Sequence, residues 1–276
     1  MRRWWVLLLL FFAAQAVQAG SANVSACGVL NASTTYNLTQ NVSLNGSTCF
    51  SSGADNIELD CQGYWIVGNK TLNVYGVTLS DSGQATINAT IKNCNFLDYD
   101  EAFNLRTTNS TIQNNVVYAI AVSGSIGINA WTGAGNNITG NTVYSYGTDA
   151  IIISTGSPTQ KTRVWNNTID IRNMSRAFNG GINGDEFYNN TIYSSTNGFT
   201  TAITIIQPSN GVSMYNNNIT ISGYNGGSSS AHTAILYGHN STIYNNYIFL
   251  NYTGSNFNGN LYGIVGPWTG VNDSVI

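Results

Sequence analysis

The chain has 276 residues, a formal net charge of −3 and only 8% charged residues. This composition excludes the basic surface that nucleic-acid binding needs. The 42% hydrophobic content, arranged in regular columns, excludes a disordered polar chain.

Residues 1–19 have the organisation of a secretory signal peptide. Arg2 and Arg3 give a basic start, an apolar run follows from Trp4 to Phe12, and small residues close the segment. The apolar run is too short for a stable membrane span, and no later segment approaches that length. The mature chain is therefore expected to be secreted, extracellular or at the cell surface, with no visible membrane span.

Four cysteines in a secreted chain predict a disulfide framework, for which three connectivities exist. Cys27 and Cys49 bracket a segment that alternates like a strand. Cys61 and Cys94 occupy the same place in the repeat described below, so one coil apart they would lie within bridging distance. We predict the pairs Cys27–Cys49 and Cys61–Cys94. A zinc site is not expected, because the spacings of the cysteines and the absence of a nearby His do not suit tetrahedral zinc ligation.

Residues 20–54 precede the repeats and are predicted to form an N-terminal cap that carries a disulfide. An open solenoid end exposes apolar side chains and unpaired strand edges, and natural solenoids cover such ends.

Residues 55–276 are predicted to form repeats of one short unit. Each copy has an apolar residue, a spacer and then one or two asparagines, and successive copies are roughly 21 to 29 residues apart. The copies begin at Ile91, Ile112, Ile138, Val164, Phe187, Met214 and Ile243. Alternating apolar and polar residues between Gly, Asn, Ser and Thr indicate short strands joined by turns. The fold predicted is an all-β, right-handed parallel β-helix solenoid of roughly eight coils, the hand following the usual strand-crossover preference.

The recurrent asparagine is expected to face inward at a fixed corner of each coil. There it can donate and accept hydrogen bonds along the axis, and Asn tolerates the positive φ of such a corner. A ligand-binding or ice-binding role for this column is the alternative.

Two stretches resemble a known family. The run from Asn56 to Ile66, which contains Asp60-Cys61, and the later Ala89–Cys94 are similar to pectin-lyase-like right-handed β-helix repeat proteins. The opening Cys27–Leu30 resembles secreted archaeal surface proteins. The resemblance extends from about Ala26 to the end and implies the fold. It implies less about activity, because enzymes, adhesins and structural surface proteins share this repeat.

The last residues, Asn272–Ile276, repeat the opening of an earlier unit and then stop in mid-coil. The chain is therefore expected to be a fragment truncated at its C-terminus.

Asn-x-Ser/Thr sequons number about 16, against about 8 expected by chance. Asn166, Asn189 and Asn218 lie in or beside the asparagine column, where burial would exclude glycans. The sites predicted to carry glycans are Asn23, Asn31, Asn37, Asn41, Asn45 and Asn69.

Acidic residues are the candidates for catalysis. Asp100 and Glu101 stand just before one apolar column, and Asp149 holds the equivalent place two coils on. Two strand spacings give about 10 Å, at the upper edge of the about 6.5–9.5 Å that an inverting pair needs. The alternative is that they are solvated turn residues. The motif set of polygalacturonases is missing, and Gly238-His239-Asn240 is only a partial echo of it.

Aromatic residues are the candidates for binding. Trp131, Trp165 and Trp268 stand at repeat-related places where they could form a platform for sugar rings, or they could simply pack between coils. No cofactor or metal is expected. The sequence favours a structural or adhesive surface protein whose partners are cell-surface glycans or surface-layer proteins. The alternative is a polysaccharide hydrolase or lyase.

Overall fold

The computed structural model describes residues 20–80, 86–119, 124–146, 149–154, 160–172, 176–181, 184–197, 203–208, 211–224, 232–236, 238, 240–253, 261–265 and 274–275. The predicted signal peptide and the C-terminal Trp268 lie outside these ranges. Within them every regular element is a β-strand, and none is a helix of the length and hydrophobicity that a bilayer crossing needs.

The strands form three parallel sheets, in which neighbours in space are one coil apart in sequence. Sheet 1 contains β1 (Ser21–Val24), β3 (Thr35–Leu38), β6 (Glu58–Asp60), β10 (Thr90–Lys92), β13 (Thr111–Gln113), β16 (Asn137–Thr139), β19 (Arg163–Trp165), β22 (Glu186–Tyr188), β25 (Ser213–Tyr215), β28 (Thr242–Tyr244) and β31 (Ser274–Val275). Sheet 2 contains β4 (Val42–Ser43), β7 (Trp65–Val67), β11 (Asn95–Leu97), β14 (Val116–Ala119), β17 (Thr142–Ser145), β20 (Thr168–Arg172), β23 (Thr191–Asn197), β26 (Asn218–Tyr224) and β29 (Tyr247–Thr253). Sheet 3 contains β2 (Gly28–Leu30), β5 (Phe50–Ser52), β8 (Tyr75–Leu79), β12 (Glu101–Thr108), β15 (Ile126–Thr132), β18 (Asp149–Ile153), β21 (Arg176–Gly180), β24 (Ile203–Pro208), β27 (His232–Leu236) and β30 (Leu261–Val265), and β9 (Thr86–Ile87) pairs with β12.

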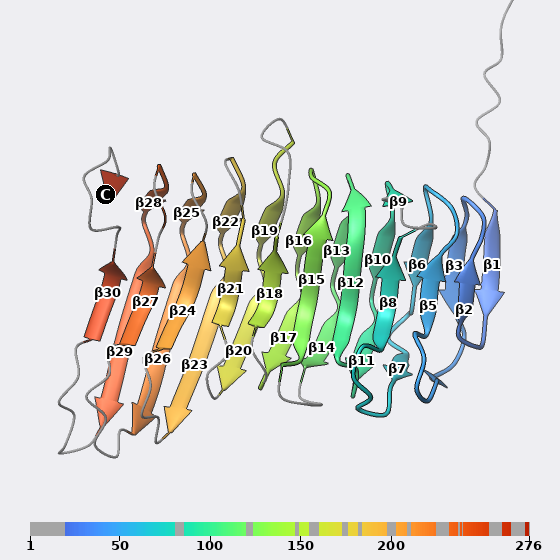
Figure 1. The fold of residues 1–276 in the computed structure, drawn as a ribbon, viewed down its shortest axis with the longest axis horizontal. Coiled ribbons are helices and arrows are strands. Elements are labelled where there is room, and N and C mark those ends of the chain that lie inside the picture. Colours follow the sequence, from blue (N-terminus) through green and yellow to red (C-terminus); the bar gives the residue numbers. More distant parts are fainter. Residues whose placement is uncertain are drawn as a thin grey trace, which may run out of the picture.

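The chain visits sheets 1, 2 and 3 in turn and then starts the next coil, so the coils stack along one axis from the blue end to the red end of Figure 1. After the first coil, sheet 2 contributes one strand to each coil, and in the described residues eight of its nine strands follow residue 54. The predicted parallel β-helix is therefore confirmed.

Residues 20–54 continue the same three sheets. β1 and β3 pair in sheet 1, and β2 and β5 pair in sheet 3, so strand pairing has no break at residue 54. The first coil passes from β1 to β2 through only Ser25, Ala26 and Cys27, without a strand in sheet 2. The Cys27–Cys49 disulfide links this short β1–β2 connection covalently to the next coil.

The core is built from inward columns in register. In sheet 1 the central residue of each three-residue strand points inward, as the half-buried, buried, half-buried pattern shows. Ile91, Ile112 and Ile138 pair in this register and are at most 1% exposed. Each fully buried aliphatic or aromatic side chain contributes ~1.5–3 kcal/mol, and the stacking makes the core continuous.

Both predicted disulfides are confirmed. Cys27–Cys49 and Cys61–Cys94 have Cα–Cα distances of 4.6 and 4.7 Å, and no cysteine is free. Because equivalent residues of stacked coils lie about one strand spacing apart, equivalence in the repeat was sufficient to pair Cys61 with Cys94.

The predicted internal asparagine column is also confirmed. The side-chain oxygen of Asn167 accepts hydrogen bonds from the backbone N–H and Nδ2 of Asn141 at 2.9 and 3.0 Å. Its own Nδ2 donates to the Asn190 side chain and to the Ile138 carbonyl. The same pattern links the asparagine ladder, which consists of Asn115, Asn141, Asn167, Asn190, Asn217 and Asn246.

One detail of that prediction is wrong: the ladder asparagines do not have the positive φ. In the Asn-Asn pairs of the ladder the first residue has it, as Asn166 (φ 55°) and Asn189 (φ 53°) show. The second residue turns inward; it is 1% exposed in most of these pairs, and half-buried at Asn246. Gly140 replaces the first asparagine in one coil, with φ 65°, because this position needs only a left-handed backbone.

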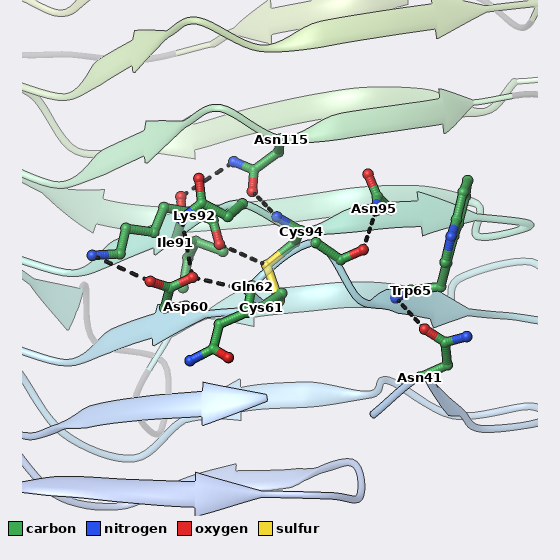
Figure 2. Close-up of a disulfide and its surroundings, with 12 residues drawn as sticks. Asn41, Asp60, Cys61, Gln62, Trp65, Ile91, Lys92, Cys94, Asn95 and Asn115 are labelled. Carbon is green, nitrogen blue, oxygen red and sulfur yellow. Dashed lines mark hydrogen bonds and ion pairs between the residues drawn. A yellow bond between two sulfur atoms is a disulfide. The ribbon is translucent and has the colours of Figure 1, made fainter. Parts of the chain in front are cut away.

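The disulfide Cys61–Cys94 extends the asparagine ladder toward the N-terminus. Figure 2 shows Asn115 beside the bridge, where its Oδ1 accepts from the Cys94 backbone N–H at 2.9 Å, as each ladder residue accepts from the preceding one. Cys61 and Cys94 are both fully buried. A covalent bond therefore replaces the amide-to-amide hydrogen bond in the first coils of the column.

Candidate functional site

A solvent-open cleft of about 520 Å³ lies on the outer face of sheet 3. Its lining is mostly polar and comes from β8, β12 and the residues flanking β8: Asn73, Tyr75, Thr78, Ser80, Glu101, Asn104 and Arg106. In register, Tyr75 pairs with Glu101 and Thr78 pairs with Asn104, so two adjacent coils supply the cleft.

A β-bulge ends this lining. Leu105 pairs with Ala130, but the next residue, Arg106, pairs with Thr132, so Trp131 of β15 is the extra residue. Bulges bend a strand and re-aim its side chains, and they are common beside functional sites. Arg106 follows the bulge and is exposed on the cleft.

Arg106 differs from the other basic residues. Within the described part of the chain, each other Lys or Arg has an acidic partner within 4 Å. Arg106 has neither an ion pair nor a hydrogen bond there. A guanidinium keeps its charge at any physiological pH and can bind a carboxylate or sulfate through two parallel hydrogen bonds. The cleft thus presents an unused anion-binding group.

Glu101 is held in a defined orientation in the cleft. Asn104 Nδ2 donates to Glu101 Oε2 at 2.7 Å, and Asn129 Nδ2 donates to Oε1 at 3.0 Å. Burial raises the pKa of Glu101 above its ordinary value; the two amide donors oppose the rise, and the charge of Asp100 adds to it. Burial, with the charges of Glu101 and Asp100, also raises the pKa of Tyr75.

We expect Glu101→Gln to stabilise the protein at neutral pH and to have little effect in acid. A raised carboxyl pKa means that the folded state prefers the protonated group, so this contribution is complete below the unfolded pKa and is lost as pH rises through the folded pKa. Gln does not ionise, so the variant avoids this loss of stability as the pH rises. Thermal unfolding of both proteins from pH 4 to pH 8 checks this, and a variant equally destabilised at both ends would contradict it.

The other two predicted carboxylates lie differently. Asp100 accepts a hydrogen bond from the Asn73 backbone N–H at 2.9 Å. Asp149 is in the same register column as Glu101, with Ile126 between them, as the sequence predicted. Asp149 is only 3% exposed, and both its oxygens bind Arg176, at 2.6 and 3.0 Å. A catalytic role for these residues stays a prediction, and among the described residues that line the cleft Glu101 is the only carboxylate.

Of the three predicted tryptophans, only Trp165 has its side chain within the described residues. Trp165 is half-buried and stacks on Tyr188 with ring centroids 5.9 Å apart and planes within 5°. Trp131 is the bulge residue of β15, its side chain is outside the described atoms, and Trp268 is outside the described residues. Their contact with glycans stays a prediction.

The sequons lie both in strands, as Asn23 in β1 and Asn37 in β3 do, and in the turns between them. Of the six predicted sites, Asn37 is half-buried and the others, Asn23, Asn31, Asn41, Asn45 and Asn69, are exposed. Asn166, Asn189 and Asn218, expected to be hindered by the column, are exposed. Each is adjacent in sequence to a ladder residue (Asn167, Asn190 or Asn217), and only that ladder side chain is buried in the column. Glycosylation itself stays a prediction.

Within the described residues, no group of three or more His, Cys, Asp or Glu side chains could hold a metal ion. The sequence identified Glu101 as a candidate site residue, but it missed Tyr75, Asn104 and Asn129. Only the register, which pairs Tyr75 with Glu101 and Asn129 with Asn104, brings these side chains together.

No protein-family model and no curated protein matches the chain. Solved structures that are similar in part include endopolygalacturonase I from Stereum purpureum, at 14% identity over 90% of this chain and 93% of that chain, with a TM-score of 0.49. Others are the Dettilon tailspike protein (12% identity, 88% of this chain, 61% of that chain, TM-score 0.43) and PfbA, a surface adhesin of Streptococcus pneumoniae (12% identity, 89% and 84%, TM-score 0.29). Identities and TM-scores this low assign no activity, ligand or family. The archaeal resemblance finds no support among these structures and stays a prediction.

Proposed function

We propose that this protein is an extracellular β-solenoid with an adhesive or structural role, and that its sheet 3 cleft binds a glycan bearing anionic groups. The observation that supports this proposal most directly is that Arg106 lies on the solvent-open cleft and has no ion pair with any described residue. A carboxylate or sulfate of the ligand would bind the guanidinium. The remaining polar side chains, among them Thr78, Ser80 and Asn104, would bind sugar hydroxyls.

The scaffold suits such a role. Both disulfides favour an oxidising compartment, in agreement with the predicted signal peptide. Because the cleft residues belong to paired strands, and Glu101 is fixed by two amides, the site is preorganised and little ordering entropy is lost on binding.

The test is titration calorimetry with a uronic-acid or sulfated oligosaccharide and with its neutral counterpart. We expect Arg106→Gln to weaken binding of the anionic ligand about ten- to a hundredfold, the range for one charge-assisted interaction, and Arg106→Lys to recover part of it. The neutral ligand should bind wild type and Arg106→Gln alike. The matched control is Arg163→Gln on sheet 1, whose side chain is paired with Glu186 away from the cleft. Equal effects of the two Gln variants would overturn the proposal.

Polysaccharide cleavage is the second candidate function, and the raised pKa of the cleft residue Glu101 favours it. A carboxyl that stays protonated at higher pH can donate a proton to a glycosidic oxygen. Release of shorter products from an acidic polysaccharide, lost in Glu101→Gln while binding is kept, would establish the enzyme. Binding without product release would leave the adhesive role.

A further inference from the structure

The outer face of sheet 1 changes character along the axis. The register column that contains Asp60, Lys92 and Gln113 is polar in the early coils and aromatic in the later ones. The aromatic members form one stack in register: Trp165, Tyr188, Tyr215 and Tyr244.

The three tyrosines of this stack are positioned with unusual regularity. Ring centroids of Tyr188 and Tyr215 are 4.8 Å apart, those of Tyr215 and Tyr244 are 4.9 Å apart, and the planes agree within 6°. All three side chains are half-buried, and Tyr188 and Tyr215 each stack on two neighbouring rings. Strand pairing fixes the spacing, because each ring stands on the next coil.

Covalent connections between coils are unevenly distributed. All four cysteines lie before residue 95, and their two bridges join only the early coils. The tyrosine stack spans coils that have no disulfide.

We infer that Tyr188, Tyr215 and Tyr244 are a site of oxidative cross-linking, in which neighbouring phenols couple to dityrosine and join the late coils covalently. The co-reactant is a one-electron oxidant of the peroxidase and hydrogen peroxide class. Each of two phenols loses one electron and its O–H proton, and the two radicals form a carbon–carbon bond between ring positions ortho to the oxygens. The two ring protons at those positions then move to the oxygens. The pair loses two hydrogen atoms overall, and one peroxide takes up both electrons and both protons to give two waters.

Geometry and exposure predict different products, which makes the inference testable. Tyr193 and Tyr247 are more open, at 48% and 63% exposed, but neither stacks on another described ring. Tyr118 and Tyr144 on sheet 2 stack at 4.7 Å and provide a second pair of the same geometry. If stacking decides, coupling joins the stacked tyrosines; if exposure decides, it involves Tyr193 and Tyr247.

The experiment treats the whole protein, at low concentration, with peroxidase and limiting peroxide, and locates cross-linked peptides by mass spectrometry. We expect a monomeric chain that has lost two hydrogens per link, with links at 188–215 or 215–244 and at 118–144. Tyr215→Phe should abolish the sheet 1 links and keep the 118–144 link, and Tyr193→Phe should change neither. Links mainly between chains, links at Tyr193 or Tyr247, or no intramolecular link would each overturn the inference. Circular dichroism of the unoxidised variants shows whether the fold is kept.

Discussion

Asn167→Ala is expected to lower the free energy of unfolding by about 3–5 kcal/mol, because it leaves several buried polar groups without partners. The Asn141 backbone N–H and Nδ2 both lose their acceptor, and the Ile138 carbonyl loses a donor. Asn167 is only 1% exposed, so water cannot replace these bonds. Urea unfolding followed by circular dichroism measures the loss.

The preceding residue provides the matched control. Asn166 is exposed and has φ 55°, a conformation that Gly adopts without strain and that Gly140 already has in the coil before. Asn166→Gly should therefore change the free energy of unfolding by no more than about 0.5 kcal/mol. Similar losses in the two variants would show that the ladder is not what stabilises the corner.

The second large effect is expected at the Cys61–Cys94 bridge. Its 33-residue separation gives about 3–4 kcal/mol from the restriction of the unfolded chain, so Cys61→Ala with Cys94→Ala should lose about that much. Because the two cysteines continue the asparagine ladder, Cys61→Asn with Cys94→Asn should restore ladder hydrogen bonds and recover about 1–2 kcal/mol of it.

Urea unfolding of the two double variants, with the wild type oxidised, makes the comparison. The Asn pair must be the more stable of the two. Equal stability of the Ala and Asn double variants would mean that asparagines at positions 61 and 94 do not form stabilising ladder hydrogen bonds.

These outcomes concern features that the sequence already indicated, and the reason is the repeat. Residues at equivalent places in successive units become neighbours one strand spacing apart, so a column in the sequence is a column in space. The inward apolar residues, the asparagine ladder and the pairing of Cys61 with Cys94 all follow from this equivalence.

The cleft could not be predicted from this equivalence between units, because its residues belong to several different columns. Repeat lengths vary, so sequence offset alone does not fix which residue of β8 faces Glu101, and the bulge at Arg106 breaks the register that an even repeat would give. The position of Asp149 was predicted, but its environment was not. It shares a column with Glu101, yet the Arg176 guanidinium donates hydrogen bonds to both of its carboxylate oxygens.

The sequence by itself determined the all-β solenoid, its inward columns and both disulfides, since these depend on local alternation and on equivalence between units. Only the tertiary structure decided which asparagine of each ladder pair turns inward, that Glu101 lies on an open cleft, and that Arg106 beside it has no acidic partner among the described residues. Those properties depend on strand register and on the side chains of neighbouring coils, and neither is encoded in the spacing of one repeat.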